Sequence, residues 1–319
     1  MTFLLNKNDL ELLASIAESR ILTPTQIAAI QQKRKQVVRR RLRALEKAGF
    51  VRSIDGALGR SRGRPEKQVS LTETGADLLR SKFSELKELP IDKLTADKLR
   101  CIDHQLLINW FRIHLRHVER IIPQLSVRFS SSISPFVMTG QSFDLVHSEQ
   151  DMRQDHHGIK EFAPDGILSI THQGKVKTLL FFLEVDMGTE SVASIGRGPR
   201  DLRQKVLNYQ ECFRESRYKP YEKIWDCALE GFRLLFLTTT EARLASICSL
   251  IQSMPPADFI WVTTMGKMFS HGLSARIWVR GGRRNAPEES ILGSELACQA
   301  PIMTSKDRLP APALPSSVS

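Results

Sequence analysis

The sequence is poor in cysteine, and the cysteines that it has form no recognisable pattern. There are five in 319 residues, an odd number, and no two are spaced as a CxxC pair: Cys101, Cys212, Cys227, Cys248 and Cys298. A disulfide framework and a cysteine zinc site both require paired or closely spaced cysteines. The sequence therefore excludes both classes.

Long hydrophobic runs are missing as well. No segment approaches the run of about 18 apolar residues that a membrane-spanning helix requires. The first residues, MTFLLNKNDLELL, have no basic start that leads into a long apolar stretch, as a secretory signal would. We therefore expect a cytoplasmic protein that has no membrane partner.

Internal repeats are absent, and the composition is that of an ordinary globular protein. Apolar residues make up 41% of the sequence and charged residues 25%, which is near the average for folded domains. A chain of this length can form two domains that each bury a core. We therefore expect two folded domains.

Positive charge is abundant and is concentrated in one part of the sequence. The formal net charge is +11, and residues 1–100 carry 21 basic and 12 acidic side chains, whereas residues 101–319 carry 25 and 23. Within the first part, residues 33–67 hold 13 basic and 3 acidic side chains. Such a local excess indicates a surface that attracts a polyanion such as DNA.

The first 86 residues have the pattern of three short helices, two strands and a closing helix. Apolar residues recur at helical spacing, Thr23 and Pro24 form a typical helix start, and Gly49 is a typical helix end. A turn rich in glycine and arginine, DGALGRSRGRPEK, joins the two strands. The expected helices lie at 9–19, 25–30, 35–48 and 72–86, and the expected strands at 50–54 and 68–71. This order predicts a winged helix-turn-helix DNA-binding domain over residues 1–86.

The remaining sequence predicts a linker, a second domain and a tail. Residues 87–97 are polar with one proline, which is typical of a linker, and residues 98–284 have the pattern of an α/β domain with a mixed sheet. Residues 285–319 are rich in proline, serine and alanine, which predicts a disordered tail. In the second domain we expect helices at 98–122, 199–216 and 240–253, and strands at 125–130, 166–171, 177–186, 232–238, 259–263 and 275–279.

The third predicted helix, KQVVRRRLRALEK, has an apolar face and a basic face. A helical wheel places apolar residues on one side, polar and basic residues opposite, and one arginine on the flank. The apolar residues are Val38, Leu42 and Leu45, the opposite residues are Gln36, Arg40, Arg43 and Lys47, and the flanking residue is Arg39. Arginine can form two hydrogen bonds to guanine, and glutamine suits adenine. The outer face therefore predicts contacts to bases of double-stranded DNA.

Two further groups of basic residues are expected to contact DNA. Lys33, Arg34 and Lys35 lie at the helix start, where side chains and free backbone N–H groups favour phosphate oxygens. The wing tip carries three arginines that alternate with small residues: Arg60, Arg62 and Arg64. Such a tip suits either the phosphate backbone or a minor groove, and both possibilities stay open.

A basic helix face can also occur in a protein that does not bind DNA. Such a face is often only solvated, and a winged helix can also serve protein contact alone. Here the basic helix follows a helix and turn and precedes a basic hairpin, so that charge and architecture coincide. This coincidence favours DNA contact over the two alternatives.

Three carboxylates in the second domain form a candidate metal site. Asp165 begins one predicted strand, and Glu184 and Asp186 lie near the end of the next, where alternation places them on the same face. Burying like charges is costly, and Mg²⁺ or Mn²⁺ would offset that cost because both prefer oxygen ligands. The hypothesis is a divalent metal site made by Asp165, Glu184 and Asp186.

Lys205 is the fourth candidate catalytic residue. It lies on the predicted helix RDLRQKVLNYQECF, one turn before Tyr209 and on the same face. In a nuclease a lysine at this place would stabilise negative charge on phosphorus, while the metal activates water. The alternative is a structural network in which the carboxylates pair with Lys205 or Arg203.

Several of these segments together resemble the replication-relaxation family, which is encoded largely on plasmids and other mobile elements. The resemblance covers roughly residues 8–240, and EVDMGTES is its most specific piece. The other pieces are VVRRRLRALEKAGFV, LTETGADLL, the helix with His104, APDGIL and KVLNYQE. The resemblance implies an N-terminal winged helix and a role in plasmid replication or DNA relaxation, as a relaxosome or replication accessory factor.

The second half also resembles the PD-(D/E)XK nucleases, which have a restriction-endonuclease-like fold. Pro164-Asp165 corresponds to the first motif of these enzymes, and Glu184-Val185-Asp186 corresponds to the second. This sequence has Asp186 where the superfamily usually has lysine. Nuclease activity would therefore require Lys205 to act from the helix.

The leading hypothesis is a DNA-binding protein of a plasmid or mobile element, acting in replication, DNA relaxation or transfer, or in their regulation. The second domain would mediate assembly or contact DNA a second time. One alternative is a magnesium-dependent DNA endonuclease or nickase of the PD-(D/E)XK type, and another is a winged-helix transcriptional repressor. The expected partners are double-stranded DNA and replication or relaxosome proteins, and a homodimer is an open alternative.

Overall fold

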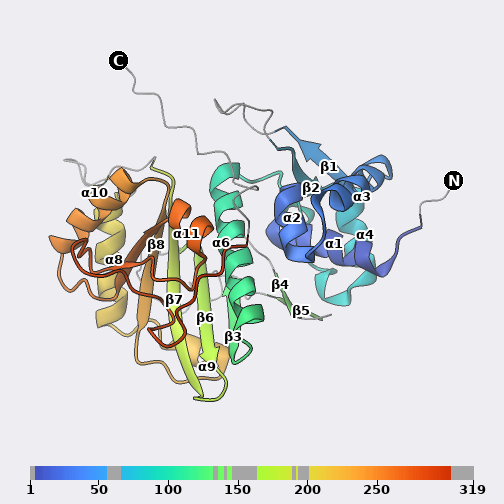
Figure 1. The fold of residues 1–319 in the computed structure, drawn as a ribbon. Coiled ribbons are helices and arrows are strands. Elements are labelled where there is room, and N and C mark those ends of the chain that lie inside the picture. The colour runs from blue at the N-terminus through green and yellow to red at the C-terminus, as the bar shows by residue number, and fades with distance from the viewer. Residues whose placement is uncertain are drawn as a thin grey trace. The chain divides into compact units, whose positions relative to one another are not determined.

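The computed structural model describes residues 4–55, 66–131, 136–139, 142–145, 164–188, 192 and 201–302. These residues divide into two compact units (Figure 1). The first unit runs to Ile113 and includes residues 136–139 and 142–145, and the second comprises His114–Ser131 and the described residues from Pro164 onward. Each unit has a core of its own, as the sequence predicts.

The first unit begins with three helices, two strands and a fourth helix. The elements are α1 (Lys7–Ser19), α2 (Pro24–Gln31), α3 (Lys35–Lys47), β1 (Val51–Ile54), β2 (Gln68–Leu71) and α4 (Glu73–Lys82). The strands pair antiparallel, with Val51 opposite Leu71 and Ile54 opposite Gln68. This is the predicted winged helix, and it packs around a core that includes Leu13, Ile16, Leu45 and Leu79.

Side-chain caps explain where the helices of the first unit start. Thr23 accepts a hydrogen bond from the backbone N–H of Gln26, and Pro24 occupies the first turn of α2, which confirms the predicted start. Asn6 caps α1 in the same way and forms a capping box with Asp9. Helix α1 therefore begins two residues earlier than its hydrophobic periodicity predicts.

Gly75 allows α4 to approach the end of α3 closely. A Cβ atom at this position would lie 2.1 Å from the backbone oxygen of Phe50. Since backbone cannot yield as a side chain can, any larger residue would push α4 away from Phe50, which joins α3 to β1. The glycine in the LTETG segment is therefore a packing requirement.

The segment predicted as a linker, 87–97, is instead folded into the first unit. It follows a 3₁₀ turn, Ser84–Leu86, and contains the short helix α5 (Ile91–Leu94). Leu86, Leu94 and Thr95 are fully buried. The prediction is wrong because it relied on the polar composition of the segment, whereas a few apolar side chains fix it in the core. The division between the units falls instead within α6 (Ile102–Ile121).

The second unit is built on a six-stranded mixed sheet with the order β10-β9-β8-β7-β6-β3. Its strands are β3 (Leu125–Ser130), β6 (Gly166–His172), β7 (Lys177–Asp186), β8 (Phe232–Thr238), β9 (Ile260–Thr264) and β10 (Val279–Arg280). Strands β7, β8 and β9 are parallel, and the other pairs are antiparallel. A separate hairpin, β4 (Phe136–Thr139) and β5 (Ser142–Leu145), belongs to the first unit. The predicted mixed α/β architecture is confirmed.

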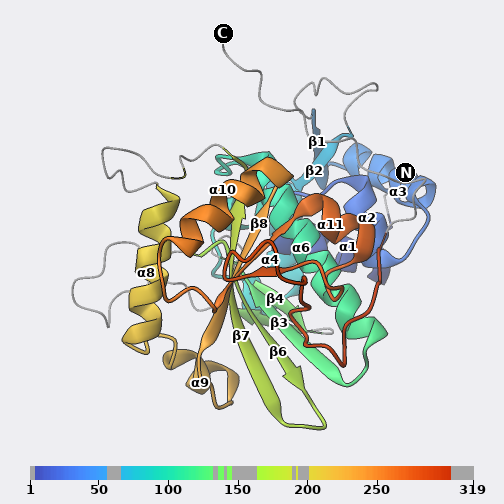
Figure 2. The same cartoon turned by 60° about the vertical axis from the view of Figure 1, so that its left-hand side comes forward.

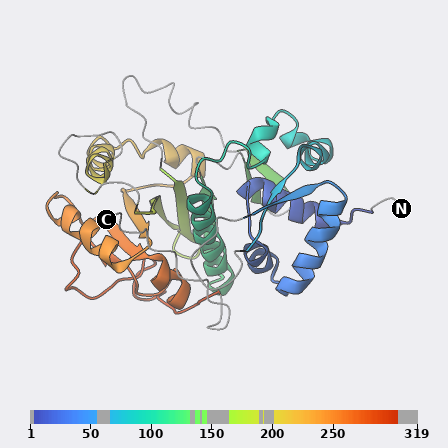
Figure 3. The ribbon, with the colours of Figure 1, turned by 90° about the horizontal axis from the view of Figure 1, so that it is seen from above.

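Helices cover both faces of the six-stranded sheet (Figure 3). One face packs against α8 (Leu202–Arg214) and α10 (Glu241–Gln252), and its core includes Phe182, Tyr209 and Phe236. On the other side His114 of α6 contacts the ring of Phe269 in α11 (Met265–His271), with the ring centroids 5.4 Å apart. Helix α9 (Pro220–Trp225) lies between α8 and β8 in the chain.

The predicted tail is ordered over residues 285–302. Glu289 pairs with Trp278 through an isolated β-bridge, and Ile291 is almost fully buried. The backbone N–H of Ala300 donates to the oxygen of His271 at 2.9 Å. The prediction of a disordered tail is therefore wrong for these residues, because a few apolar anchors outweigh the polar composition, and residues 303–319 lie outside the described residues.

Strands β6 and β7 form a long hairpin (Figure 2), and one residue of its turn is strained. Residues 173–176 join the paired residues His172 and Lys177, and Val176 has φ of 47°. A β-branched residue is strained in this left-handed region, whereas asparagine tolerates it. Val176 is also 88% exposed, so no packing holds it in place.

Replacing Val176 with asparagine is therefore expected to stabilise the protein, by about 1 kcal/mol in free energy of unfolding. Urea unfolding measures the effect. Val176→Thr is the matched control, because threonine keeps the branched Cβ and should show no gain. Equal stability of the two variants would contradict the assigned backbone conformation.

Candidate nucleic-acid interface and carboxylate cluster

Helix α3 presents a basic face to solvent. We use this name for five residues that are all exposed: Gln36, Arg39, Arg40, Arg43 and Lys47. The opposite side of the helix is held in the core by Val38, Leu42 and Leu45. The predicted orientation of the helix is confirmed, and contact of the face with DNA stays a prediction.

Most cations on and near this face form no ion pair with a described carboxylate. Among the described residues, no carboxylate forms an ion pair with Arg40, Arg43 or Lys47, nor with Lys33 or Arg34 before the helix. Their charges are therefore not neutralised by a described carboxylate. Arg34 is the N-cap residue, and no side chain caps the first backbone N–H groups of α3.

Lys35 and Arg39 are different, because Glu66 lies beside them. The Oε1 atom of Glu66 is 2.7 Å from Nζ of Lys35 and 3.5 Å from Nη2 of Arg39. The same oxygen accepts a hydrogen bond from the hydroxyl group of Thr25 at 2.9 Å. Among the residues predicted to contact DNA, Lys35 and Arg39 thus pair with the carboxylate of Glu66, whereas the other described residues do not.

Arg41 anchors the helix and was not predicted as a functional or structural residue. Its guanidinium group bonds both carboxylate oxygens of Asp9 on α1, and these bonds raise the pKa of Arg41 above its ordinary value. Asp9 is 2% exposed. The only signal in the sequence is that Arg41 lies beside the apolar stripe of α3 on the helical wheel.

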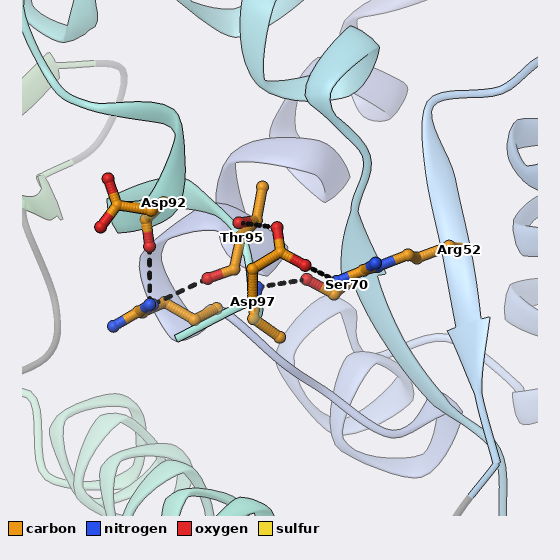
Figure 4. Close-up of polar contacts among 7 residues, drawn as sticks. Arg52, Ser70, Asp92, Thr95 and Asp97 are labelled. Atoms are coloured by element: carbon orange, nitrogen blue, oxygen red, sulfur yellow. Dashed lines mark hydrogen bonds and ion pairs between the residues drawn. The ribbon is translucent and has the colours of Figure 1, made fainter. Parts of the chain in front are cut away.

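The strands of the wing are tied to the segment that follows α5 (Figure 4). Arg52 on β1 bonds Asp97, which also accepts from the Thr95 hydroxyl group at 2.6 Å. Ser70 on β2 accepts from the backbone N–H of Ala96 at 2.9 Å. Both strands are therefore fixed to the folded segment 91–97.

Arg20 completes this network from the end of α1. It donates to the backbone oxygen of Thr95 at 2.9 Å and to that of Asp92 at 2.6 Å. The contacts fix the base of the wing, whereas the predicted wing-tip residues Arg60, Arg62 and Arg64 lie outside the described residues. Hydrogen bonds therefore hold both β1 and β2 against segment 91–97.

In the second unit, Glu184 and Lys205 come together as predicted. Nζ of Lys205 is 3.1 Å from Oε2 of Glu184, and the Tyr209 hydroxyl group donates to Oε1 at 2.6 Å. Asp165 accepts from the backbone N–H of Val185 at 2.7 Å, and its negative charge acts on Glu184. We call Asp165, Glu184, Lys205 and Tyr209 the carboxylate cluster.

Burial raises the pKa of Glu184 to about 7. The charge of Asp165 adds to the increase, whereas Lys205 and the hydrogen bond from Tyr209 oppose it. The cost of burying the charged form thus exceeds the attraction of Lys205. Glu184 therefore changes its charge near neutral pH.

This pKa predicts that the free energy of unfolding falls as pH rises. Glu184 binds its proton more tightly in the folded state, so its contribution to stability is lost between the ordinary pKa of 4.5 and the folded value of about 7. The expected loss is about 1 to 3 kcal/mol. Urea unfolding at pH 5, 6, 7 and 8 should show a steeper decline for the wild type than for Glu184→Gln. Parallel curves would contradict the prediction.

Asp186 shares the sheet face of Glu184 but has different partners. Its two oxygens receive hydrogen bonds from Arg243 of α10 at 2.7 and 2.8 Å, and Thr238 donates to it at 3.0 Å. The sequence did not indicate Arg243 as a partner. Asp186 is therefore engaged by β8 and α10, whereas Glu184 is engaged by α8.

No group of three metal-binding side chains is found within the described ranges. None of the described helices has the length and apolar content to cross a membrane.

In the carboxylate cluster, Asp165 and Glu184 supply two acidic side chains near one another. A third ligand would have to replace the bonds of Asp186 to Arg243 or come from elsewhere.

Comparison with known proteins identifies one family. The family model described as replication-relaxation matches residues 13–226, and no curated protein matches the sequence. One similar solved structure is a cysteine-to-serine mutant of MarR from E. coli complexed with operator DNA. It is 19% identical with a TM-score of 0.23, over 36% of this chain and 75% of that chain. The family match includes both α3 and the carboxylate cluster.

Proposed function

We propose that this chain, which belongs to the replication-relaxation family, binds double-stranded DNA through the basic face of α3. The observation that supports the proposal is the exposure of Arg40, Arg43 and Lys47, none of which pairs with a described carboxylate. Unneutralised cations on one exposed helix side attract phosphate and release its counterions. The description of the family, replication-relaxation, supports a role in DNA replication or relaxation. We propose that this DNA belongs to a plasmid or another mobile element.

The arrangement suits a helix that enters the major groove. Gln36, Arg40 and Arg43 would face base edges, where arginine prefers guanine and glutamine prefers adenine. Lys33 and Arg34 would bind phosphates at the helix start, together with the backbone N–H groups that no side chain caps. The braced wing strands would place Arg60, Arg62 and Arg64 along the backbone or in a minor groove.

A second candidate function is a Mg²⁺- or Mn²⁺-dependent DNA endonuclease or nickase. The observation behind it is that Nζ of Lys205 lies 3.1 Å from Glu184, on which the charge of Asp165 also acts. The same ion pair would form in a purely structural network, so only an activity assay distinguishes the two. In this proposal the second unit has a restriction-endonuclease-like core, with Lys205 in place of the usual strand lysine. Asp186 is retained as a candidate ligand, although its bonds to Arg243 and Thr238 favour a structural role.

The cluster fits a divalent cation in part. Asp165 and Glu184 are two nearby oxygen donors of the kind that such an ion prefers, but Lys205 and Tyr209 already bond both oxygens of Glu184. Asp165 and Glu184 would hold the ion, which when bound would lower the pKa of a coordinated water molecule. Lys205 would stabilise negative charge on the phosphate, and Tyr209 would orient Glu184 through its hydrogen bond.

Supercoiled plasmid, incubated with the full chain with and without Mg²⁺, separates the two functions. Retention without change in topology supports binding alone, whereas conversion to the nicked or linear form supports the enzyme. In the second case Asp165→Asn and Glu184→Gln should abolish cleavage and leave retention unchanged. The control Asp226→Asn alters an exposed acidic residue whose left-handed backbone suits asparagine. Lack of retention at low salt would contradict the proposed function.

The remaining alternatives are distinguished by where the protein binds. A transcriptional repressor would protect a compact operator in a footprint, and a replication factor would protect sites at an origin or transfer region. Binding with half-sites about one helical turn apart would indicate a homodimer. Replication or relaxosome proteins remain proposed partners.

A further inference from the structure

Glu66 is the acidic residue that pairs with two cations at the start of α3. It lies just before β2, and its side chain is 18% exposed. Its Oε1 atom contacts three groups at once: Nζ of Lys35, Nη2 of Arg39 and the hydroxyl group of Thr25. The carboxylate therefore joins α2 and α3 to the chain that leads into β2.

This carboxylate lowers the number of cations that are available to phosphate. Lys35 and Arg39 are 41% and 49% exposed, so both can reach solvent. While they share Glu66, however, their attraction for phosphate is partly cancelled. Nonspecific DNA binding depends chiefly on the number of phosphates that a protein neutralises. Glu66 should therefore weaken nonspecific binding more than it weakens base contacts.

We propose that Glu66 is a specificity-determining residue, which holds Lys35 and Arg39 away from phosphates of unselected DNA. The inference rests on the proposed function, because it concerns the same DNA-binding face. Thr25 fixes the carboxylate through a hydrogen bond from its uncharged hydroxyl group, so the negative charge stays in place even when a phosphate attracts the two cations. Base contacts by Arg40 and Arg43 do not involve Glu66, and they keep their full strength.

Glu66→Gln is a suitable test because it removes the charge and keeps an oxygen that Thr25 can bond. The full chain would be titrated against a fluorescently labelled 30-base-pair duplex of mixed sequence and against a duplex enriched by selection from a random pool. Glu11→Gln is the matched control, since Glu11 is an exposed acid on α1 and its replacement changes the net charge equally.

Glu66→Gln should bind the mixed-sequence duplex several-fold more tightly than the wild type. The slope of log affinity against log salt should steepen by about 0.9 to 1.8, which corresponds to one or two additional phosphates. The ratio of affinities for selected and mixed-sequence DNA should fall several-fold. Glu11→Gln should leave the slope and this ratio unchanged.

A second comparison excludes a purely structural role. In a background that carries Lys35→Gln and Arg39→Gln, the Glu66→Gln change should no longer alter the salt slope. If Glu66→Gln matches Glu11→Gln, or if its effect persists in that background, the specificity role is wrong while DNA binding stands. If the wild type binds neither duplex at low salt, the proposed function itself fails, and this inference fails with it.

Discussion

Replacing Arg40 and Arg43 together with alanine is expected to weaken binding to the selected duplex by about 30-fold or more. Each bidentate contact to guanine contributes about 1 to 3 kcal/mol, and about 1.4 kcal/mol is a tenfold change in affinity. Both side chains are exposed and neither pairs with a described carboxylate, so the fold should be unaffected. Fluorescence anisotropy measures the affinity, and thermal unfolding verifies the fold.

The control for this variant removes two cations elsewhere in the first unit. Lys82→Ala with Lys87→Ala makes the same change in net charge at exposed positions outside α3. If DNA contacts the basic face, the control should weaken binding far less. Equal losses in the two double variants would show that diffuse charge, and not α3, accounts for the affinity.

Asp186→Ala is expected to destabilise the second unit by about 3 to 5 kcal/mol, the cost of leaving one partner of a buried ion pair uncompensated. The side chains of Asp186 and Arg243 are 2% and 14% exposed, and two hydrogen bonds join them. Removal of the carboxylate breaks both of these bonds to the buried guanidinium group. Urea unfolding of the full chain measures the loss.

A double variant tests whether the loss comes from the broken ion pair. Asp186→Ala combined with Arg243→Met removes both charges and should be less destabilised than Asp186→Ala alone. Glu230→Ala, at an exposed acidic residue, is the control and should change stability little. If the double variant is less stable than Asp186→Ala, the loss of stability does not come from the uncompensated charge of Arg243.

The sequence predicts the parts of the fold that follow periodic patterns. The apolar stripe of α3 is regular, so the exposed basic face follows from it. Side chains alternate in direction along any strand, so Glu184 and Asp186 share one side of β7. Lys205 also reaches Glu184 as predicted, because it lies one turn from Tyr209 on α8. Local patterns are thus sufficient for these elements and for the direction of their side chains.

Long-range polar pairs account for most of what the sequence does not reveal. Arg41 bonds Asp9 across 32 positions in the sequence, and Arg243 bonds Asp186 across 57. Neither pairing has a local pattern, because it depends on how helices pack. The folding of segment 91–97 and of the residues after 285 also depends on packing between distant parts of the chain. There a few buried side chains, such as Leu94 and Ile291, outweigh a polar composition.

The most direct test of the central claim is the salt dependence of duplex binding by the wild-type chain. A labelled 30-base-pair duplex would be titrated from about 50 to 400 mM salt. If the cations of α3 and the wing neutralise six or more phosphates, the log–log slope should be about −5 or steeper. A slope near zero, or no binding at the lowest salt concentration, would contradict the assignment of this surface to DNA.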